Sequence, residues 1–341
     1  MGWLTRAFGG DARGPRQQGA ALQAALLAVL DRDLDAAESL LSRAVKLDSQ
    51  AVEPYAALAR LYRVRGEVGR AIRMHQNLLL RRDLSPGEQT AVLADLAADF
   101  QQGGFLRRAI ASYEELLGRD PGNRAALRAL PRLLAQARSY PRAIRMARRQ
   151  ARIEGRDASA QEAELWVETA EAAQAEGRSE VARRAVRRAL RRDRRSVRAW
   201  ILRGALEAER NRPKAALAAW SRVPAIDRRA AARVYPSIEA TFAALDRSRD
   251  YEVFLRRLLE QDPEDREARL ALARSLAARG DADAAASELR GLLDADADDV
   301  EVRATLGRLL LAEGRETGPE LAALIDALER RGLFGPREKL A

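Results

Sequence analysis

The stretch that decides the fold is "YRVRGEVGRAIRMHQNLL", residues 62 to 79. Its apolar residues recur at the three- and four-residue spacing of an amphipathic helix, and Gly66 marks a turn near its start. It also holds His75, the only histidine of the chain. The stretch is therefore either the edge of an active site or one copy of a segment that the chain repeats.

Comparison of this stretch with the rest of the chain indicates a repeat. Similar segments begin near residues 18, 52, 90, 124, 163, 197, 232, 266 and 300, and the commonest spacing is 34 residues. This is the period of the tetratricopeptide repeat, a pair of antiparallel helices. We therefore expect an all-α fold, a right-handed superhelical solenoid of such pairs. Its parts would be a flexible or amphipathic leader at residues 1–17, eight repeats at residues 18–299, and a partial repeat with a C-terminal cap at residues 300–341.

Small residues recur at the two positions where paired helices must cross. Counted from the start of each repeat, the eighth position holds Ala25, Ala59, Ala97, Ala170, Gly204 and Ala273. The twentieth position holds Ala37, Ala71, Ala109, Ala143, Ala182, Ala216 and Ala285, and only Tyr251 breaks the series. Two helix axes approach to about 8–10 Å only where the residues at the crossing are small. Larger apolar residues at other fixed positions, such as Leu58, Phe100 and Trp220, predict the core between pairs.

Glycine and aspartate mark the ends of the predicted helices. Gly66, Gly104, Gly177, Gly280 and Gly314 share a slot between the two helices of a pair, where a left-handed residue ends the first helix. A second slot holds Asp48, Asp120, Asp193, Asp227, Asp262 and Asp296, joined by Glu154. We expect these carboxylates to accept hydrogen bonds from backbone N–H groups as the next helix begins. The two longest spacings carry the polar insertions "LSPGEQ" (84–89) and "EGRDASAQ" (154–161), expected at junctions between repeats.

His75 falls at the twenty-fourth position, where other repeats have Leu41, Tyr113 or Trp220. We therefore expect a packed and hydrogen-bonded core histidine. A catalytic or metal-binding role would need partners, and the chain has no second histidine and no cysteine. The sequence also lacks a glycine-rich phosphate loop and a Ser-His-Asp set. We expect a protein that is not an enzyme, with no cofactor, no metal and no small-molecule substrate.

The first helices of such a solenoid line a concave groove, and the second, fifth, ninth and twelfth positions of each repeat face it. In this chain those positions include Arg60, Arg63, Gln101, Arg128, Arg132, Gln174, Arg198 and Arg274, among many alanines. A groove of this kind would suit a protein or peptide partner with acidic and small apolar residues. The alternative is that these are ordinary solvent-facing residues of an arginine-rich protein.

The whole chain has a formal net charge of +10, and most of the excess positive charge lies in one segment. From residue 138 to residue 198 there are 17 arginines and 9 acidic residues, which leaves 17 − 9 = +8. The run "RRAVRRALRRDRRSVR" (183–198) predicts a cationic outer helix face of Arg183, Arg184, Arg187, Arg188, Arg191, Arg192 and Arg195. The alternative function is therefore anion binding, to RNA or acidic lipid head groups. No aromatic residues interleave with these arginines to stack bases, which disfavours nucleic acid.

The N-terminal residues 1–10, "MGWLTRAFGG", place Trp3, Leu4, Ala7 and Phe8 on one side of a short helix, as in weak membrane-surface anchors. The alternative is a leader that is disordered or docked on the first repeat. The stretch "GAALQAALLAVLDRD", from Gly19, has the character of a secretory signal core, but it falls in register with the repeat. A helix that spans a bilayer needs about 20 apolar residues, and no apolar stretch of this sequence is close to that length.

Beyond the generic repeat, residues 58–89 resemble the bacterial lipopolysaccharide assembly protein B family. The likeness lies in the core R-x-R-G-E-V-x-R-A-I-R-x-H-Q, here Arg63 to Gln76, and continues more weakly over residues 50 to 260. The resemblance implies a cytoplasmic repeat array tethered to the inner membrane. It further implies an adaptor between a membrane-bound ATP-dependent protease and the deacetylase that commits lipid A synthesis, which restrains lipopolysaccharide production.

Two features of that family have no counterpart in this sequence. The family begins with a transmembrane helix, where this chain has "MGWLTRAF", and ends with a rubredoxin-like zinc module of paired cysteines, which this chain lacks. We therefore expect a non-catalytic adaptor or scaffold of this lineage. Its expected location is the bacterial cytoplasm, peripheral to the inner membrane, with a role in lipopolysaccharide biosynthesis.

Overall fold

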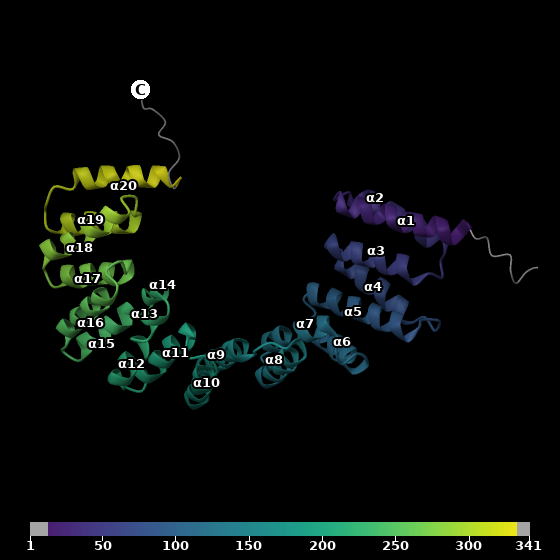
Figure 1. The fold of residues 1–341 in the computed structure, drawn as a ribbon, viewed down its shortest axis with the longest axis horizontal. Helices are drawn as coiled ribbons and strands as arrows, with labels where there is room; N and C mark the ends of the chain where they lie inside the picture. The colour runs from purple at the N-terminus through teal and green to yellow at the C-terminus, as the bar shows by residue number, and fades with distance from the viewer. Residues whose placement is uncertain (1–12, 333–341) are drawn as a thin grey trace, which may run out of the picture. The chain divides into compact units, whose positions relative to one another are not determined.

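The computed structural model describes residues 13–332, and all regular structure within them is helical. This confirms the all-α class and the repeat organisation expected from the sequence. The chain divides into two compact units, Met1–Thr169 and Ala170–Ala341, with the division inside helix α9. Each unit is a stack of antiparallel helix pairs joined by short turns (Figure 1).

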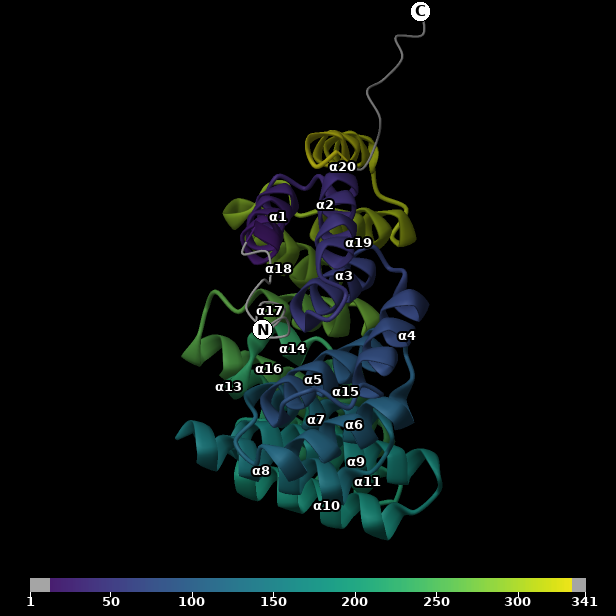
Figure 2. The ribbon, with the colours of Figure 1, turned by 90° about the vertical axis from the view of Figure 1, so that its right-hand side faces the viewer.

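The N-terminal unit consists of α1 to α8 and most of α9. Their bounds are α1 Arg13–Leu30, α2 Leu34–Leu47, α3 Val52–Val64, α4 Val68–Leu79, α5 Pro86–Gln102, α6 Leu106–Arg119, α7 Arg124–Gln136, α8 Tyr140–Glu154 and α9 Ser159–Ala175. In this unit α1 packs on α2, α3 on α4, α5 on α6 and α7 on α8, and each couple forms a pair. Seen from the side, α1 and α2 lie at one end of this stack and α8 at the other (Figure 2).

The C-terminal unit continues the same pattern. Its helices are α10 Ser179–Arg192, α11 Val197–Ala208, α12 Pro213–Trp220, α13 Val223–Ile226, α14 Arg228–Ala231, α15 Tyr235–Ala244, α16 Ser248–Gln261, α17 Arg266–Ala278, α18 Ala282–Ala295, α19 Val300–Ala312 and α20 Gly318–Arg330. The short helices α13 and α14 lie between α12 and α15, which are themselves shorter than most other helices of the unit. Both α17 on α18 and α19 on α20 form antiparallel pairs.

The crossing residues lie where the sequence places them. All seven alanines of the twentieth position are fully buried, and Tyr251, which breaks that series, is also buried. At the eighth position, Gly204 of α11 shows why a small residue is required. A Cβ atom there would lie 2.2 Å from the Nε1 of Trp220. The pairs therefore close because these positions carry little or no side chain.

The turn inside each pair has the same backbone conformation in every repeat described. The predicted glycines have positive φ angles, from 64° at Gly314 to 86° at Gly280. Where glycine is absent, the turn still contains a left-handed residue, namely Arg32, Arg138, Asn211 or Asp246, at φ 54° to 60°. The left-handed turn is thus a requirement of the helix pair, and glycine is only the residue that meets it with least strain.

The recurrent aspartates have a different role from the one expected. Asp48, Asp120, Asp193 and Asp296 end the second helix of a pair instead of starting the next. Their carboxylates accept the backbone N–H two residues on, for example that of Gln50 at 2.8 Å, which fixes the loop. The following helices are capped by residues three positions later, Asn123, Ser196, Asp265 and Asp299. Asp227 alone caps the next helix directly, because α14 begins one residue after it.

The two polar insertions lengthen helices. Ser85 and Glu88 form a reciprocal capping box at the start of α5, and Pro86 occupies its first turn. Both α5 and α9 have 17 residues, whereas α3 and α7 have 13. The insertions therefore extend the first helix of a pair at its N-terminal end by about one turn.

Of the expected leader, residues 13–17 form the beginning of α1, and residues 1–12 lie outside the described residues. The membrane contact expected for residues 1–10 falls in that part. Among the described helices, none has both the length and the apolar character that a bilayer crossing requires.

Candidate functional site

His75 occupies the buried junction of α3, α4 and α5. Its Nδ1 lies 2.6 Å from Oδ2 of Asp99, and both side chains are fully buried. Arg63 donates to the other carboxylate oxygen of Asp99 at 2.8 Å and to the backbone oxygen of Asp95 at 3.0 Å. This confirms the expected packed and hydrogen-bonded core histidine. Within the described residues there is no group of three or more His, Cys, Asp or Glu residues that could hold a metal ion.

The expected groove residues of α3 are tied to the neighbouring first helix. Arg60 donates from Nε to Asp95 of α5 at 2.8 Å, and Arg63 joins both Asp95 and Asp99. The hydrogen bond to Asp95 raises the pKa of Arg60. These two arginines therefore hold α3 and α5 together, and their charge is largely compensated.

Three further residues that were expected in the groove, Gln101, Arg128 and Arg132, line one hollow of the N-terminal unit. It has a volume of about 590 Å³ and lies on α7, with one side formed by α5 and α6. Gln101 accepts a hydrogen bond from the hydroxyl of Tyr113 at 3.0 Å, and Arg128 reaches Glu154 at 3.3 Å. Arg132 is exposed and forms no ion pair within residues 13–332. The hollow thus combines one free guanidinium group with amide and hydroxyl groups.

The remaining groove residues belong to the C-terminal unit and bind acidic side chains of adjacent first helices. Gln174 donates to Glu209, Arg198 donates to both carboxylate oxygens of Glu171 at 3.0 and 2.8 Å, and Arg274 donates to Glu301 at 2.9 Å. Arg274 also lines a small hollow of about 60 Å³ with Tyr235, Glu239 and Tyr251. These side chains connect successive repeats, a role that sequence spacing alone does not reveal.

The arginine-rich helix α10 is exposed along most of its expected anion-binding face. The exposed residues are Arg184, Arg187, Arg188, Arg191, Arg192 and Arg195. Arg183 does not lie on that face, because its side chain is buried and pairs with Glu180. Burial lowers the pKa of Arg183, and the nearby charge of Arg210 lowers it further.

The fold adds residues to this helix that the sequence does not connect with it. Trp200 and Arg203 of α11, and Arg222 just before α13, line one cavity with Arg187 and Arg191 of α10. The cavity has a volume of about 670 Å³. An aromatic ring therefore does lie among the arginines, although none interleaves with them along the chain. The signal that could have found it is repeat position, since Trp200 occupies the fourth position of its repeat.

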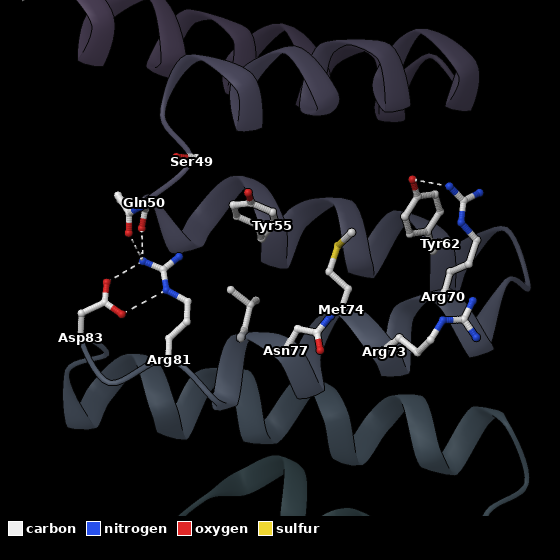
Figure 3. Close-up of a pocket in the computed structure, with 11 residues that line it drawn as sticks. Ser49, Gln50, Tyr55, Tyr62, Arg70, Arg73, Met74, Asn77, Arg81 and Asp83 are labelled. Atoms are coloured by element: carbon white, nitrogen blue, oxygen red, sulfur yellow. Dashed lines mark hydrogen bonds and ion pairs between the residues drawn. The ribbon is translucent and has the colours of Figure 1, made fainter.

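The fourth position of the second repeat is Tyr55, and it lines a comparable cavity of about 570 Å³ that sequence reasoning missed. Figure 3 shows its residues on α3, α4 and the flanking loops. At one end Arg81 binds Asp83 and the backbone oxygen of Gln50, and this arginine lowers the pKa of Asp83. At the other end the guanidinium of Arg70 lies 3.8 Å from the centre of the Tyr62 ring. Most of its cationic groups are thus already engaged.

Known proteins share this architecture. Family models described as tetratricopeptide repeat match residues 95–159, 167–232 and 252–309. The lipopolysaccharide assembly protein B of Escherichia coli (strain K12) is 26% identical over 258 residues, which cover 75% of this chain and 66% of that protein. The chain therefore matches slightly less than two thirds of that relative's length.

Two solved structures of repeat proteins match part of this chain. A tetratricopeptide repeat protein from Parabacteroides merdae ATCC 43184 is 16% identical, with a TM-score of 0.42 over 76% of this chain and 99% of that one. The C-terminal part of a repeat-containing protein from Cytophaga hutchinsonii is 12% identical, with a TM-score of 0.47 over 74% of this chain and 99% of that one.

Proposed function

This chain belongs to the tetratricopeptide repeat family, and we propose on that basis that it is a non-catalytic adaptor that binds a protein partner. The observation that carries the proposal is the hollow of about 590 Å³ on α7. Its volume lies within the range of about 300–1,000 Å³ typical of ligand sites.

The chemistry of the hollow indicates what kind of peptide it would accept. Ala125, Ala129 and Leu133 lie on one helical face and provide an apolar strip among the polar side chains that line the rest of the hollow. Arg132 can pair with a carboxylate of the ligand because it has no ion-pair partner within residues 13–332. Gln136 adds an amide group that can bind a peptide backbone. The partner segment is therefore an extended peptide in which an acidic residue lies among small apolar ones.

The finer proposal is a role in regulating lipopolysaccharide biosynthesis at the cytoplasmic side of the inner membrane. It is supported by the match to the Escherichia coli lipopolysaccharide assembly protein B across 258 residues. That match includes repeats on which the hollow is built, so the same surface is the natural place for a shared partner.

A photo-crosslinking experiment in cells tests the adaptor proposal. A photoreactive amino acid at Ala129 should give a protein adduct of defined mass, and the same residue at Arg145 on α8 should not. Arg132→Glu should abolish the adduct, whereas Arg145→Glu, an exposed position with the same charge change, should leave it intact. If no adduct forms, or if the adduct survives Arg132→Glu, the hollow is not the partner site.

A second measurement tests the lipopolysaccharide role separately. The chain is expressed in an Escherichia coli strain that lacks its own lipopolysaccharide assembly protein B, and lipopolysaccharide per cell is measured. We expect a lower level with the chain than with an empty vector, and no decrease with Arg132→Glu. An adduct at Ala129 without any change in lipopolysaccharide would support the adaptor and reject this role.

A further inference from the structure

We propose that the cavity bounded by α10, α11 and α13 binds a compact ligand that carries two or more phosphate groups. The site is separate from the proposed peptide site, because all its lining residues lie between positions 187 and 226, whereas the peptide hollow lies on α5, α6 and α7. Its volume of about 670 Å³ suits a small ligand.

The cavity carries positive charge that no carboxylate in its lining compensates. Five arginines line the cavity and no carboxylate does, namely Arg187, Arg191, Arg194, Arg203 and Arg222. Within the described part of the chain, none of the five forms an ion pair. Neighbouring arginines behave differently, since Arg198 pairs with Glu171 and Arg183 with Glu180. Cations gathered in a concave surface without counter-charge create a positive potential that attracts anions.

Part of the cavity wall is already fixed. The indole Nε1 of Trp200 donates to the backbone oxygen of Arg194 at 2.8 Å. The guanidinium carbon of Arg203 lies 5.2 Å from the centre of the Trp200 ring, within the range of a cation–π contact. Leu190, which also lines the cavity, is buried. A wall ordered before binding reduces the conformational entropy that the ligand must overcome.

The number of guanidinium groups decides the class of ligand. Arginine binds phosphate through two parallel N–H···O hydrogen bonds, so one phosphate group engages only a few of the five arginines. A ligand with two or more phosphate groups on a small scaffold can engage all of them. Such chemistry is found in soluble nucleoside polyphosphates and in phosphorylated lipid head groups. A nucleic-acid strand fits less well, because successive bases need several aromatic rings to stack on. Trp200 is the one aromatic residue in the cavity lining, and Arg203 already contacts its ring.

The test uses defined probes and the full chain. Inorganic pyrophosphate and ATP are titrated by isothermal calorimetry, and vesicles of phosphatidylcholine with or without phosphatidylinositol bisphosphate, whose head group carries several phosphates, are tested by co-sedimentation. We expect saturable binding of a soluble polyphosphate, of the phosphatidylinositol bisphosphate vesicles, or of both, and the pattern identifies the source. Ligand binding should also change tryptophan fluorescence, and Trp200→Phe should remove that change. Absence of binding in every arm would overturn the proposal.

Matched variants separate the cavity from the general charge of α10. Arg203→Gln with Arg222→Gln removes two cavity arginines, neither of which lies on α10. Arg184→Gln with Arg195→Gln removes the same charge from exposed positions outside the cavity. The first pair should weaken binding by about tenfold or more, because hydrogen bonds to charged groups are lost. The second pair should have little effect.

Two outcomes would contradict this assignment. Equal weakening by both pairs would show only a diffuse attraction to positive charge. Tighter binding of a single-stranded RNA oligonucleotide that ignores the cavity variants would show that α10 serves a different ligand. Helix content and melting temperature are measured for each variant, and Arg222→Gln alone, at an exposed position, replaces the double variant if that one does not fold.

Discussion

The imidazole Nδ1 of His75 and the carboxylate Oδ2 of Asp99 lie 2.6 Å apart in the protein interior, where neither side chain is exposed to solvent. Arg63 completes the set by donating to the second oxygen of Asp99. Other repeats fill the equivalent position with apolar side chains such as Leu41 and Trp220. The junction between the second and third repeats is therefore held by polar pairing in a place where its counterparts rely on apolar packing.

Loss of Asp99 should be far more damaging than loss of an exposed aspartate. Asp99→Ala leaves the Nδ1–H of His75 buried without its acceptor and removes one of the acceptors of Arg63. We expect a cost of about 3 kcal/mol in the free energy of unfolding. Urea unfolding followed by circular dichroism measures the effect. Asp31→Ala, at an exposed position, should change stability by less than about 0.5 kcal/mol. Equal effects of the two substitutions would contradict a structural role for the pair.

Adding one methyl group at the crossing of α11 and α12 should lower the stability of the protein. Gly204→Ala would place a carbon 2.2 Å from Nε1 of Trp220, which donates to the backbone oxygen of Ile201 at 3.1 Å. Trp220 must then move, and we expect a loss of about 1–3 kcal/mol together with altered tryptophan fluorescence. Gly118→Ala is the matched control, because Gly118 lies in α6 with open space around it. That change should stabilise the protein by about 0.5–1 kcal/mol.

The left-handed turns predict opposite effects for reciprocal substitutions. Gly280→Ala forces an alanine into a φ of 86°, which should cost about 1–2 kcal/mol. Arg32→Gly relieves a non-glycine residue at φ 60°, and the gain should be below about 1 kcal/mol because glycine also loses more entropy on folding. Melting temperatures report both. A fall in melting temperature with Arg32→Gly would mean that its side chain stabilises the turn in some other way.

Acid should weaken the contact between α17 and α19. The hydrogen bond from Arg266 lowers the pKa of Glu301 below its usual 4.5. Burial alone would raise the pKa of Asp299, but hydrogen bonds from Arg266 and from the N–H of Val302 lower it overall below 3.8. Carboxyl groups whose pKa is depressed in the folded state bind fewer protons there than in the unfolded state. Their stabilising contribution is therefore complete above about pH 4.5 and is lost as the pH falls through the folded values.

Arg266→Gln tests this dependence. The variant should be less stable than the parent at neutral pH by about 1–2 kcal/mol, and the difference should shrink as the pH falls from about 5 to about 3. Urea unfolding at several pH values measures it. Arg330→Gln removes a more exposed pair, in which Arg330 also lowers the pKa of Asp298, and it should give a smaller pH-dependent difference because solvent screens that pair. A constant difference between parent and Arg266→Gln at all pH values would contradict the assigned linkage.

The repeat could be predicted from the sequence because its determinants are local and periodic. Helix crossings require small residues, so alanines such as Ala71 and Ala109 recur at them. Left-handed turns favour glycine, so residues such as Gly66 indicate where those turns lie. The polar insertion at residues 84–89 was less informative, because polar residues suit both a loop and the first turn of a helix. Only the capping box of Ser85 shows which one forms.

The candidate sites were harder to predict, since they depend on side chains far apart in the chain. Arg60 lies 35 residues before its acceptor Asp95, and nothing in the spacing identifies that partner. Arg183 is buried although seven other arginines of its run are exposed, because the arginines of the run occupy more than one side of α10. The place of Trp200 among the arginines could not be predicted from their run, because it lies on the helix after them and the cavity is formed by α10, α11 and α13.

The His75–Asp99 pair has a consequence for how the chain assembles. Repeats that share alanine crossings present nearly interchangeable surfaces, so a newly made chain can stack them in the wrong order. The second repeat is protected from this error, because no other first helix has a carboxylate at the position of Asp99, and a wrong neighbour would bury the imidazole N–H without its charged acceptor. A single histidine thus favours the correct neighbour for one repeat in an otherwise repetitive chain.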